Sequence, residues 1–288
     1  MNDIFNIRRF GRYLLSDIKN CAAGYGLSMA LICSMGIIIY AGTVLMGLVF
    51  KGTWEGPEHG FRLFTFMISM FVLFTSMPVK CYGGITDKRK GTSWIMLPVS
   101  VTEKFLSMVI MTAVAAPVVA GGVYMLIDAI ICALDPTCGA PIFGTCTDFV
   151  NSMIEIGVAT NNDLNNFPQM ADFVKQVSSP WLYIDDIIMI SLIFLMGSIL
   201  FKKSKTAKTI FSYIAISMAI SMIITPMISG HIMEIIRNVN LFETADDVNA
   251  LFGTWFFRNA ALIDTINDTI INVALLTGIF LRIRTLKH

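Results

Sequence analysis

The sequence predicts an all-α fold: a polytopic membrane protein with six transmembrane helices, both termini in the cytoplasm and an amphipathic helix at its N-terminal end. Hydrophobic residues make up 55% of the 288 residues and charged residues only 14%, whereas soluble domains are less apolar and more charged. Long runs without charge recur along the chain, and basic residues gather between alternate runs. We expect one membrane domain over residues 1–288.

The segment before the first apolar run, residues 1–25, has the pattern of a helix that lies in the inner membrane surface. Its apolar face comprises Ile7, Phe10, Leu14 and Ile18. The basic residues Arg8, Arg12 and Lys19 fall roughly opposite that face. The alternative is a solvated basic anchor with no defined docking.

The apolar runs define the expected spans, because about 20 apolar residues cross a hydrocarbon layer roughly 30 Å thick. Three runs are long enough alone, and those at 187–201 and 269–281 reach the length if they begin near residues 181 and 262. The expected spans are therefore about 26–50, 62–79, 105–133, 181–201, 209–230 and 262–281.

The basic residues orient these spans, since Lys and Arg in short loops resist translocation and acidic residues count for little. With the N-terminus inside, the cytoplasmic segments are 1–25, 80–104, 202–208 and 282–288, and the long outer loops are 135–180 and 231–258. The Lys and Arg residues outside these inner segments are Lys51, Arg62, Lys175, Arg237 and Arg258. Topology thus explains the basic residues, so the expected partner is the lipid bilayer of a bacterial cytoplasmic (inner) membrane and not nucleic acid.

Two cysteines in the first long outer loop, Cys138 and Cys146, flank a turn-forming stretch at 139–145. Their short separation permits a disulfide in an oxidising compartment, and two free thiols are the alternative. No Cys or His cluster has the spacing of metal ligands, so we expect no metal site.

Acidic residues near the outer ends of the spans form a second candidate constellation. Asp264 and Asp268 share one helical face at the start of the sixth span, and Asp185 and Asp186 stand at the mouth of the fourth. Asp128 comes late in the third span. Because ionisable groups within spans often mark pathways, Asp128, Asp264 and Asp268 are candidates for a substrate path. Capping of helix starts is the alternative, and Asp128 fits it least.

Enzymatic motifs are missing from the sequence. It has no Gly-x-x-x-x-Gly-Lys-Ser/Thr phosphate loop, no Gly-x-Ser-x-Gly elbow and no His-Glu-x-x-His pair. We therefore expect neither an enzyme nor a cofactor bound by this chain.

The inner loop at 80–104 changes from basic to apolar and ends in a proline turn. Its candidate coupling residues are Asp87, Lys88, Arg89, Lys90, Gly91, Thr92, Trp94, Ile95, Met96, Leu97, Pro98 and Glu103. A short helix carrying residues 94–97 would insert apolar anchors into a groove on a soluble protein, with the basic residues steering the encounter. Ser100 and Glu103 have the spacing of a capping box at the start of span three. Alternatively, residues 94–97 lie in the lipid interface.

This loop resembles the one between spans two and three of type-2 ATP-binding-cassette transporter permeases. The resemblance rests on Asp87, Gly91, Thr92, Leu97, Pro98, Val99, Ser100 and Glu103. It implies the permease subunit of an exporter, a separate ATPase subunit that holds ATP and Mg, and a second permease copy in a homo- or heterodimer. The loop at 80–104 would then be the coupling loop. The alternative is a membrane anchor or an immunity-type sensor that binds a partner without transport.

Overall fold

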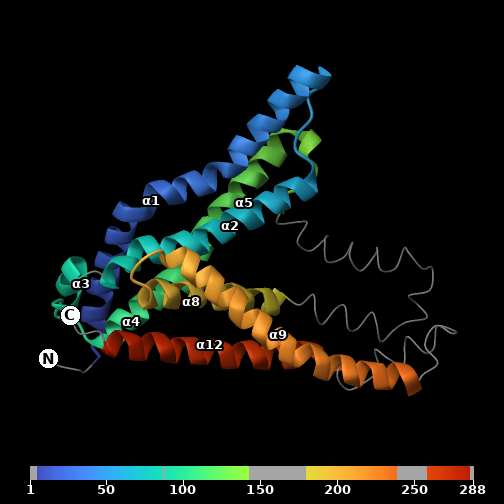
Figure 1. Ribbon diagram of the computed structural model, residues 1–288. Helices are drawn as coiled ribbons and strands as arrows, with labels where there is room; N and C mark the ends of the chain where they lie inside the picture. The colour runs from blue at the N-terminus through green and yellow to red at the C-terminus, as the bar shows by residue number, and fades with distance from the viewer. Residues whose placement is uncertain (1–4, 87, 143–179, 239–257, 286–288) are drawn as a thin grey trace. The chain divides into compact units, whose positions relative to one another are not determined.

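The computed structural model describes residues 5–86, 88–142, 180–238 and 258–285, and the regular structure in these residues is helical, with no strand among them (Figure 1). The prediction of an all-α fold is therefore confirmed for the part of the chain that is described. The helices and helical turns are α1 (Ile7–Met46) with a π segment (Gly47–Lys51), α2 (His59–Tyr82) with a 3-10 turn (Gly83–Thr86), α3 (Lys88–Ile95), α4 (Val101–Val109), a π segment (Ile110–Ala115), α5 (Ala116–Leu134), a 3-10 turn (Pro136–Cys138), α8 (Pro180–Leu200), α9 (Lys205–Asn238) and α12 (Ala260–Thr285).

Each of the six predicted spans coincides with helix. Four stretches of the described helices are long and apolar enough to cross a membrane: Ile7–Lys51, His59–Thr86, Val101–Leu134 and Ala261–Thr285. These helices suit a membrane protein by length and composition. The count of six spans and the cytoplasmic placement of both termini stay predictions.

The first helix is longer than the sequence pattern indicates. Asn6 caps it by accepting hydrogen bonds from the backbone N–H groups of Arg8 and Arg9 at 3.0 and 3.4 Å, and α1 then continues without a break to Met46. The segment expected in the membrane surface and the first predicted span thus belong to one helix, whose axis changes direction along its length in Figure 1. Asp17, Cys21 and Tyr25 are buried, so residues 7–25 pack against other helices.

The chain divides into two compact units. The first contains Met1–Cys146, Ile187–Thr209 and Asn272–His288, and the second contains Thr147–Asp186 and Ile210–Ile271. In the first unit α1 packs along α2 and α5. Its fully buried side chains include Leu73, Met108, Tyr124, Leu195 and Ile279.

Small residues let helices of the first unit approach closely. A methyl group at Gly197 of α8 would overlap the side chain of Thr209 in α9. Gly36 of α1 faces the ring of Tyr124, and a Cβ there would stand 3.5 Å from it. Lipid is as apolar as a leucine side chain, so close packing at small residues is a main source of helix association in membranes.

A buried ion pair joins the beginning of α2 to the end of α5. Arg62 Nη1 donates a hydrogen bond to Asp128 Oδ1 at 2.9 Å, and both side chains are buried. The other terminal nitrogen of Arg62 donates to the carbonyls of Cys138 and Ala140 at 2.7 and 2.8 Å. Asp128 Oδ2 accepts the backbone N–H of Ile142 at 2.7 Å. The pair therefore folds residues 138–142 back over the helix ends.

Asp135 ties the connection between α1 and α2 to the same region. Its carboxylate accepts from the N–H and hydroxyl of Thr137 at 2.9 and 2.7 Å, and from Trp54 Nε1 and Tyr40 OH at 2.8 Å each. The Thr137 hydroxyl, then Trp54 and Tyr40, hold the pKa of Asp135 well below its usual range. The Thr137 hydroxyl also accepts the N–H of Gly56 at 2.9 Å. These contacts cross-link the connection between α1 and α2 to the segment that follows α5.

We predict that Arg62→Met and Asp128→Leu each destabilise the protein by about 3–5 kcal/mol, because either change leaves one buried charge without its partner. Thermal unfolding in detergent measures the loss. The double variant removes both charges and should lose less stability than the two single variants added together.

The matched control is Lys51→Gln, which breaks the exposed pair between Lys51 and Glu55 (2.8 Å). Exposed pairs contribute little, so the melting temperature should stay unchanged. Additive losses in the Arg62 and Asp128 variants would contradict a coupled pair.

Candidate functional site

The loop at 80–104 contains a short helix, but this helix carries only Trp94 and Ile95 of the four residues predicted to lie on it, and an exposed turn follows. Helix α3 ends at Ile95, and Met96 and Leu97 lie in the turn that follows. The turn is closed by hydrogen bonds from Met96 N to Thr92 O at 3.1 Å and from Val99 N to Leu97 O at 2.7 Å. Met96 is 74% exposed and Leu97 37% exposed. The turn thus presents apolar side chains that this chain does not bury.

Trp94 contacts its own chain. The ammonium of Lys104 lies 4.8 Å from the centroid of the Trp94 ring and donates a hydrogen bond to the Trp94 carbonyl at 3.0 Å. Lys104 is buried in the first turn of α4. Cation–π contacts of this kind strengthen when the cation is desolvated. Trp94 therefore joins the end of α3 to the start of α4. Among the described side chains of the loop, Met96 and Leu97 form the exposed apolar surface.

The predicted capping box is confirmed at the start of α4. The backbone N–H of Glu103 donates to Ser100 Oγ at 3.3 Å, and the backbone N–H of Ser100 donates to Glu103 Oε2 at 3.1 Å. Both contacts satisfy backbone donors that the helix itself leaves unpaired. The cap fixes the direction in which the loop enters α4.

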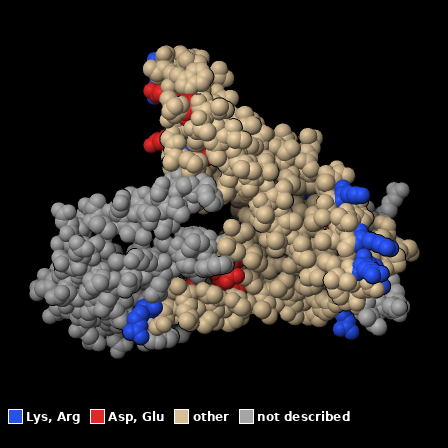
Figure 2. Space-filling model, turned by 180° about the vertical axis from the view of Figure 1, so that it is seen from behind, with Lys and Arg blue, Asp and Glu red and all other residues tan. Residues whose placement is uncertain are grey.

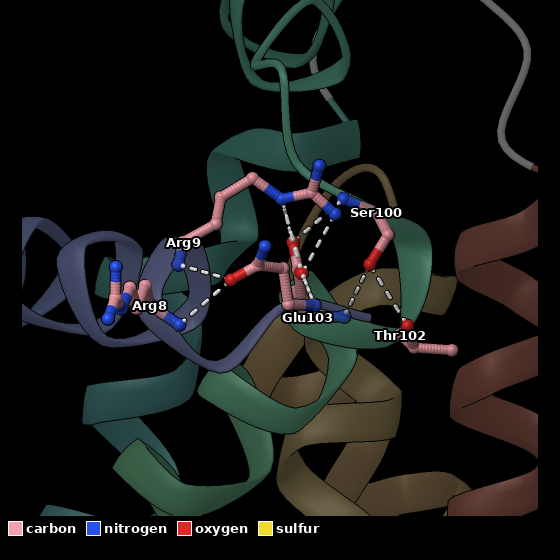
Figure 3. A network of polar contacts seen from close by, with 6 residues as sticks. Arg8, Arg9, Ser100, Thr102 and Glu103 are labelled. Atoms are coloured by element: carbon pink, nitrogen blue, oxygen red, sulfur yellow. Dashed lines mark hydrogen bonds and ion pairs between the residues drawn. The ribbon is translucent and has the colours of Figure 1, made fainter. Parts of the chain in front are cut away.

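The same carboxylate joins the loop to the beginning of α1 (Figure 3). Arg9 Nε donates to Glu103 Oε2 at 2.8 Å, and Arg9 Nη2 donates to Oε1 at 2.9 Å. The backbone N–H of Asn6 also donates to Oε1, at 2.8 Å. Glu103 is fully buried, so it acts through the segments that it joins and does not itself reach a soluble partner.

A second buried carboxylate, that of Asp17 in α1, reinforces this assembly. Its Oδ2 accepts from the hydroxyl of Tyr82 at 2.8 Å and from that of Ser107 at 2.6 Å. These two residues come from the end of α2 and from α4. Asp17 therefore ties together the helices on both sides of the inner loop.

Lys205 connects the loop at 202–208 to the end of the helical segment that precedes α3. It donates to the carbonyl of Gly83 and, at 2.7 Å, to the hydroxyl of Thr86. Both acceptors lie in the 3-10 turn that precedes α3.

Figure 2 shows Lys and Arg side chains gathered on the right of the view, at the end of the molecule where α3 lies in Figure 1.

Sequence reasoning missed Arg9, Asp17 and Lys205. The sequence identified Arg9 and Lys205 only as basic residues of the predicted cytoplasmic segments. It identified Asp17 only as an acidic residue within the predicted amphipathic helix at 1–25. A buried charge needs a partner, but the residues paired here stand far apart in the sequence. The one available signal was that Asp17 falls on a helix whose other charges are mostly basic.

The remaining predicted coupling residues are partly described. Gly91 is buried, and Pro98 is exposed in the turn. Asp87 lies outside the described residues, as do the side chains of the basic triplet at 88–90 and of Ile95.

The acidic candidates have different environments. Asp128 is occupied by Arg62 and by the N–H of Ile142. Asp264 and Asp268 lie beyond the first turn of α12, and Asp185 and Asp186 lie beyond that of α8, since neither first turn contains an acidic residue. The capping alternative is therefore wrong for these carboxylates, because only the first turn has unpaired backbone N–H groups.

The predicted disulfide stays a prediction: Cys138 is buried, and Cys146 lies outside the described residues. Among the described residues no three His, Cys, Asp or Glu side chains are grouped so that they could hold a metal ion.

Comparisons of the chain with protein-family models, with curated proteins and with solved structures found no significant match.

We predict that Glu103→Gln loosens the inner loop, because the neutral amide keeps the shape but loses the charged contact with Arg9. Charge-assisted hydrogen bonds are worth about 1.5–3 kcal/mol, so trypsin should cleave at the basic triplet 88–90 about tenfold faster or more. Cleavage in inside-out vesicles, followed by mass spectrometry, gives the rate.

Thr102→Ala is the matched control, since Thr102 is exposed in the same turn and bonds only the Ser100 hydroxyl at 3.0 Å among the contacts described. Its cleavage rate should equal that of the unchanged protein. Equal rates in the Glu103→Gln protein would show that the carboxylate does not restrain the loop.

Proposed function

We propose that the protein is the permease subunit of an ATP-binding-cassette exporter in a bacterial cytoplasmic membrane. It would form the substrate path and receive mechanical work from a separate ATPase through the loop at 80–104. The observation that carries this proposal is the exposed apolar turn at Met96 and Leu97, whose base is locked to α1 and α4 by buried charged contacts.

The contacts at the base suit the loop to transmit force. A flexible loop would absorb a displacement of its tip, whereas charged hydrogen bonds in a buried setting resist it. Glu103 and Lys104 hold the two ends of the turn to the start of α4. Through Arg9 the same carboxylate holds α1. Movement of the turn would therefore move two long apolar helices together.

The tip has the chemistry of a docking element. Met96 and Leu97 would enter an apolar groove on the ATPase, as in helix-in-groove recognition, and the neighbouring basic triplet would steer an acidic rim toward it. Pro98 ends the helical stretch and keeps the apolar side chains in a compact turn.

Other subunits would hold ATP and complete the substrate path. Because it has no phosphate loop, ATP and Mg would be held by the ATPase subunit. A second permease copy, identical or not, would complete the path, as the resemblance of the loop to type-2 permeases implies. The inner location of the loop follows from the basic residues.

We predict that Met96→Asp combined with Leu97→Asp abolishes co-purification with a phosphate-loop ATPase co-expressed from the neighbouring reading frame, because two charges would enter an apolar groove. Stimulation of ATP hydrolysis by the permease should disappear as well. Both readouts use the full-length chain in detergent.

Met96→Leu is the matched control and should retain binding and stimulation, because it keeps the apolar volume. Binding that survives the double substitution would refute docking through this turn. Binding without any stimulation of hydrolysis by the unchanged protein would instead favour an anchor or sensor.

A further inference from the structure

Helix α12 carries three polar residues on one face, each one turn from the next: Asp264, Asp268 and Asn272. Asp264 is exposed, and Asp268 is only 5% exposed. Farther along the same helix Ile279 and Ile283 are buried in apolar packing. The helix therefore leads from an exposed carboxylate to a buried one and then becomes apolar.

Helix α8 brings two more carboxylates to this level. A Cβ at Gly278 of α12 would stand 3.1 Å from the methyl carbon of Met196 in α8, and both helices run from right to left in Figure 1. Asp186 precedes Met196 by as many residues as Asp268 precedes Gly278. Because both helices rise equally per residue, Asp186 and Asp268 stand equally far from that contact along their own helices.

The carboxylates lie close enough to one another to interact. Asp268 is repelled by Asp264, Asp186 and Asp185, and Asp186 is repelled by Asp264 and Asp185. All four residues belong to the second compact unit. They form one acidic group, which we call the α8–α12 acidic group.

Asp268 neither caps a helix nor pairs with a cation, the two roles that most often account for a carboxylate in an apolar helix. It lies two turns into α12 and so caps no backbone N–H group. No residue in the described ranges gives it a hydrogen bond or an ion pair, although three other carboxylates repel it. A buried carboxylate without a counter-charge is costly, and neighbouring carboxylates add to that cost.

The other buried carboxylates of the described helices each accept a hydrogen bond. Asp17 accepts from the hydroxyl of Tyr82, Glu103 accepts from Arg9, and Asp128 accepts from Arg62. Within the described residues Asp268 accepts none, so we expect a bound molecule to supply its counter-charge.

We propose that the α8–α12 acidic group binds an amphiphilic organic cation, with Asp268 as the buried counter-ion. The described residues hold no group of three acidic, His or Cys side chains that could take a metal ion. Carboxylates that do not converge on one point suit a cation larger than a metal ion. Exposed apolar residues of the same helices, Ile184 and Leu262, supply a surface for its hydrophobic part.

That this cation is the exporter's cargo rests on the proposed function, whereas the binding site does not. Asp264 and the two α8 carboxylates would raise the local concentration of cations near the exposed end. Asp268 would hold the charge where apolar helices exclude water, so that the electrostatic attraction is strong. A neutral molecule of the same shape would gain only the apolar contact.

The test uses tetraphenylphosphonium and the purified full-length permease in lipid nanodiscs without an ATPase. Equilibrium dialysis should show saturable binding that Asp268→Asn weakens at least tenfold and Asp268→Glu preserves. The double variant Asp186→Asn with Asp264→Asn, which changes only exposed carboxylates, should also weaken binding and guards against a folding defect in the buried variant. Glu58→Gln is the control, because it removes an acid elsewhere and should leave binding unchanged.

Binding of tetraphenylphosphonium that is equal in all these variants, or no saturable binding at all, would overturn the site. Triphenylphosphine oxide, a neutral analogue, should bind the unchanged protein and Asp268→Asn equally, and unequal binding would contradict an electrostatic role.

A second measurement separates the site from the proposed function. If tetraphenylphosphonium binds but the permease does not stimulate ATP hydrolysis by the co-expressed ATPase, the site stands and the exporter assignment fails. If the permease stimulates ATP hydrolysis but does not bind the cation, the exporter assignment stands and the proposed site fails.

Discussion

A single buried carboxylate, that of Glu103, determines how the loop at 80–104 is held to the rest of the protein. An ionised side chain in an apolar fold must find opposite charge and hydrogen-bond donors, or its burial costs several kcal/mol. Glu103 finds Arg9, the backbone of Asn6 and the backbone of Ser100. Two segments that are remote in the sequence, residues 6–9 and 100–103, are thereby fixed to each other, and the exposed turn at Met96 and Leu97 stands on that base.

The same requirement shapes the other end of the first unit. Arg62 and Asp128 satisfy each other inside the helices, and their remaining hydrogen-bonding capacity goes to residues 138–142. Paired charges thus fix the positions of neighbouring helices relative to one another, which non-directional apolar contacts do not do. The α8–α12 acidic group departs from this rule, because the charged groups found to act on Asp268 in the described part of the chain are all carboxylates. A buried charge that no described residue neutralises is available to a ligand.

The amount of structure that the sequence predicted differs from region to region. Apolar runs placed a helix in every expected span, since the pattern and its interpretation are both local. The capping box at Ser100 was also predictable, because its two members are three residues apart. The end of α3 was less predictable. The apolar run at 94–97 indicated a helix through Leu97, but α3 ends at Ile95. Met96 and Leu97 are exposed in a turn.

The sequence by itself determined the helical class, the positions of the helices, the cap of α4 and the absence of a phosphate loop, because each follows from residues close together in the chain. Only the tertiary structure decided which charges are paired. Arg9 and Glu103 are separated by 94 positions, and Arg62 and Asp128 by 66. Any of the 21 basic residues could in principle serve any of the 20 acids. Packing selects among them by bringing two particular side chains to one buried place, where low dielectric makes pairing obligatory.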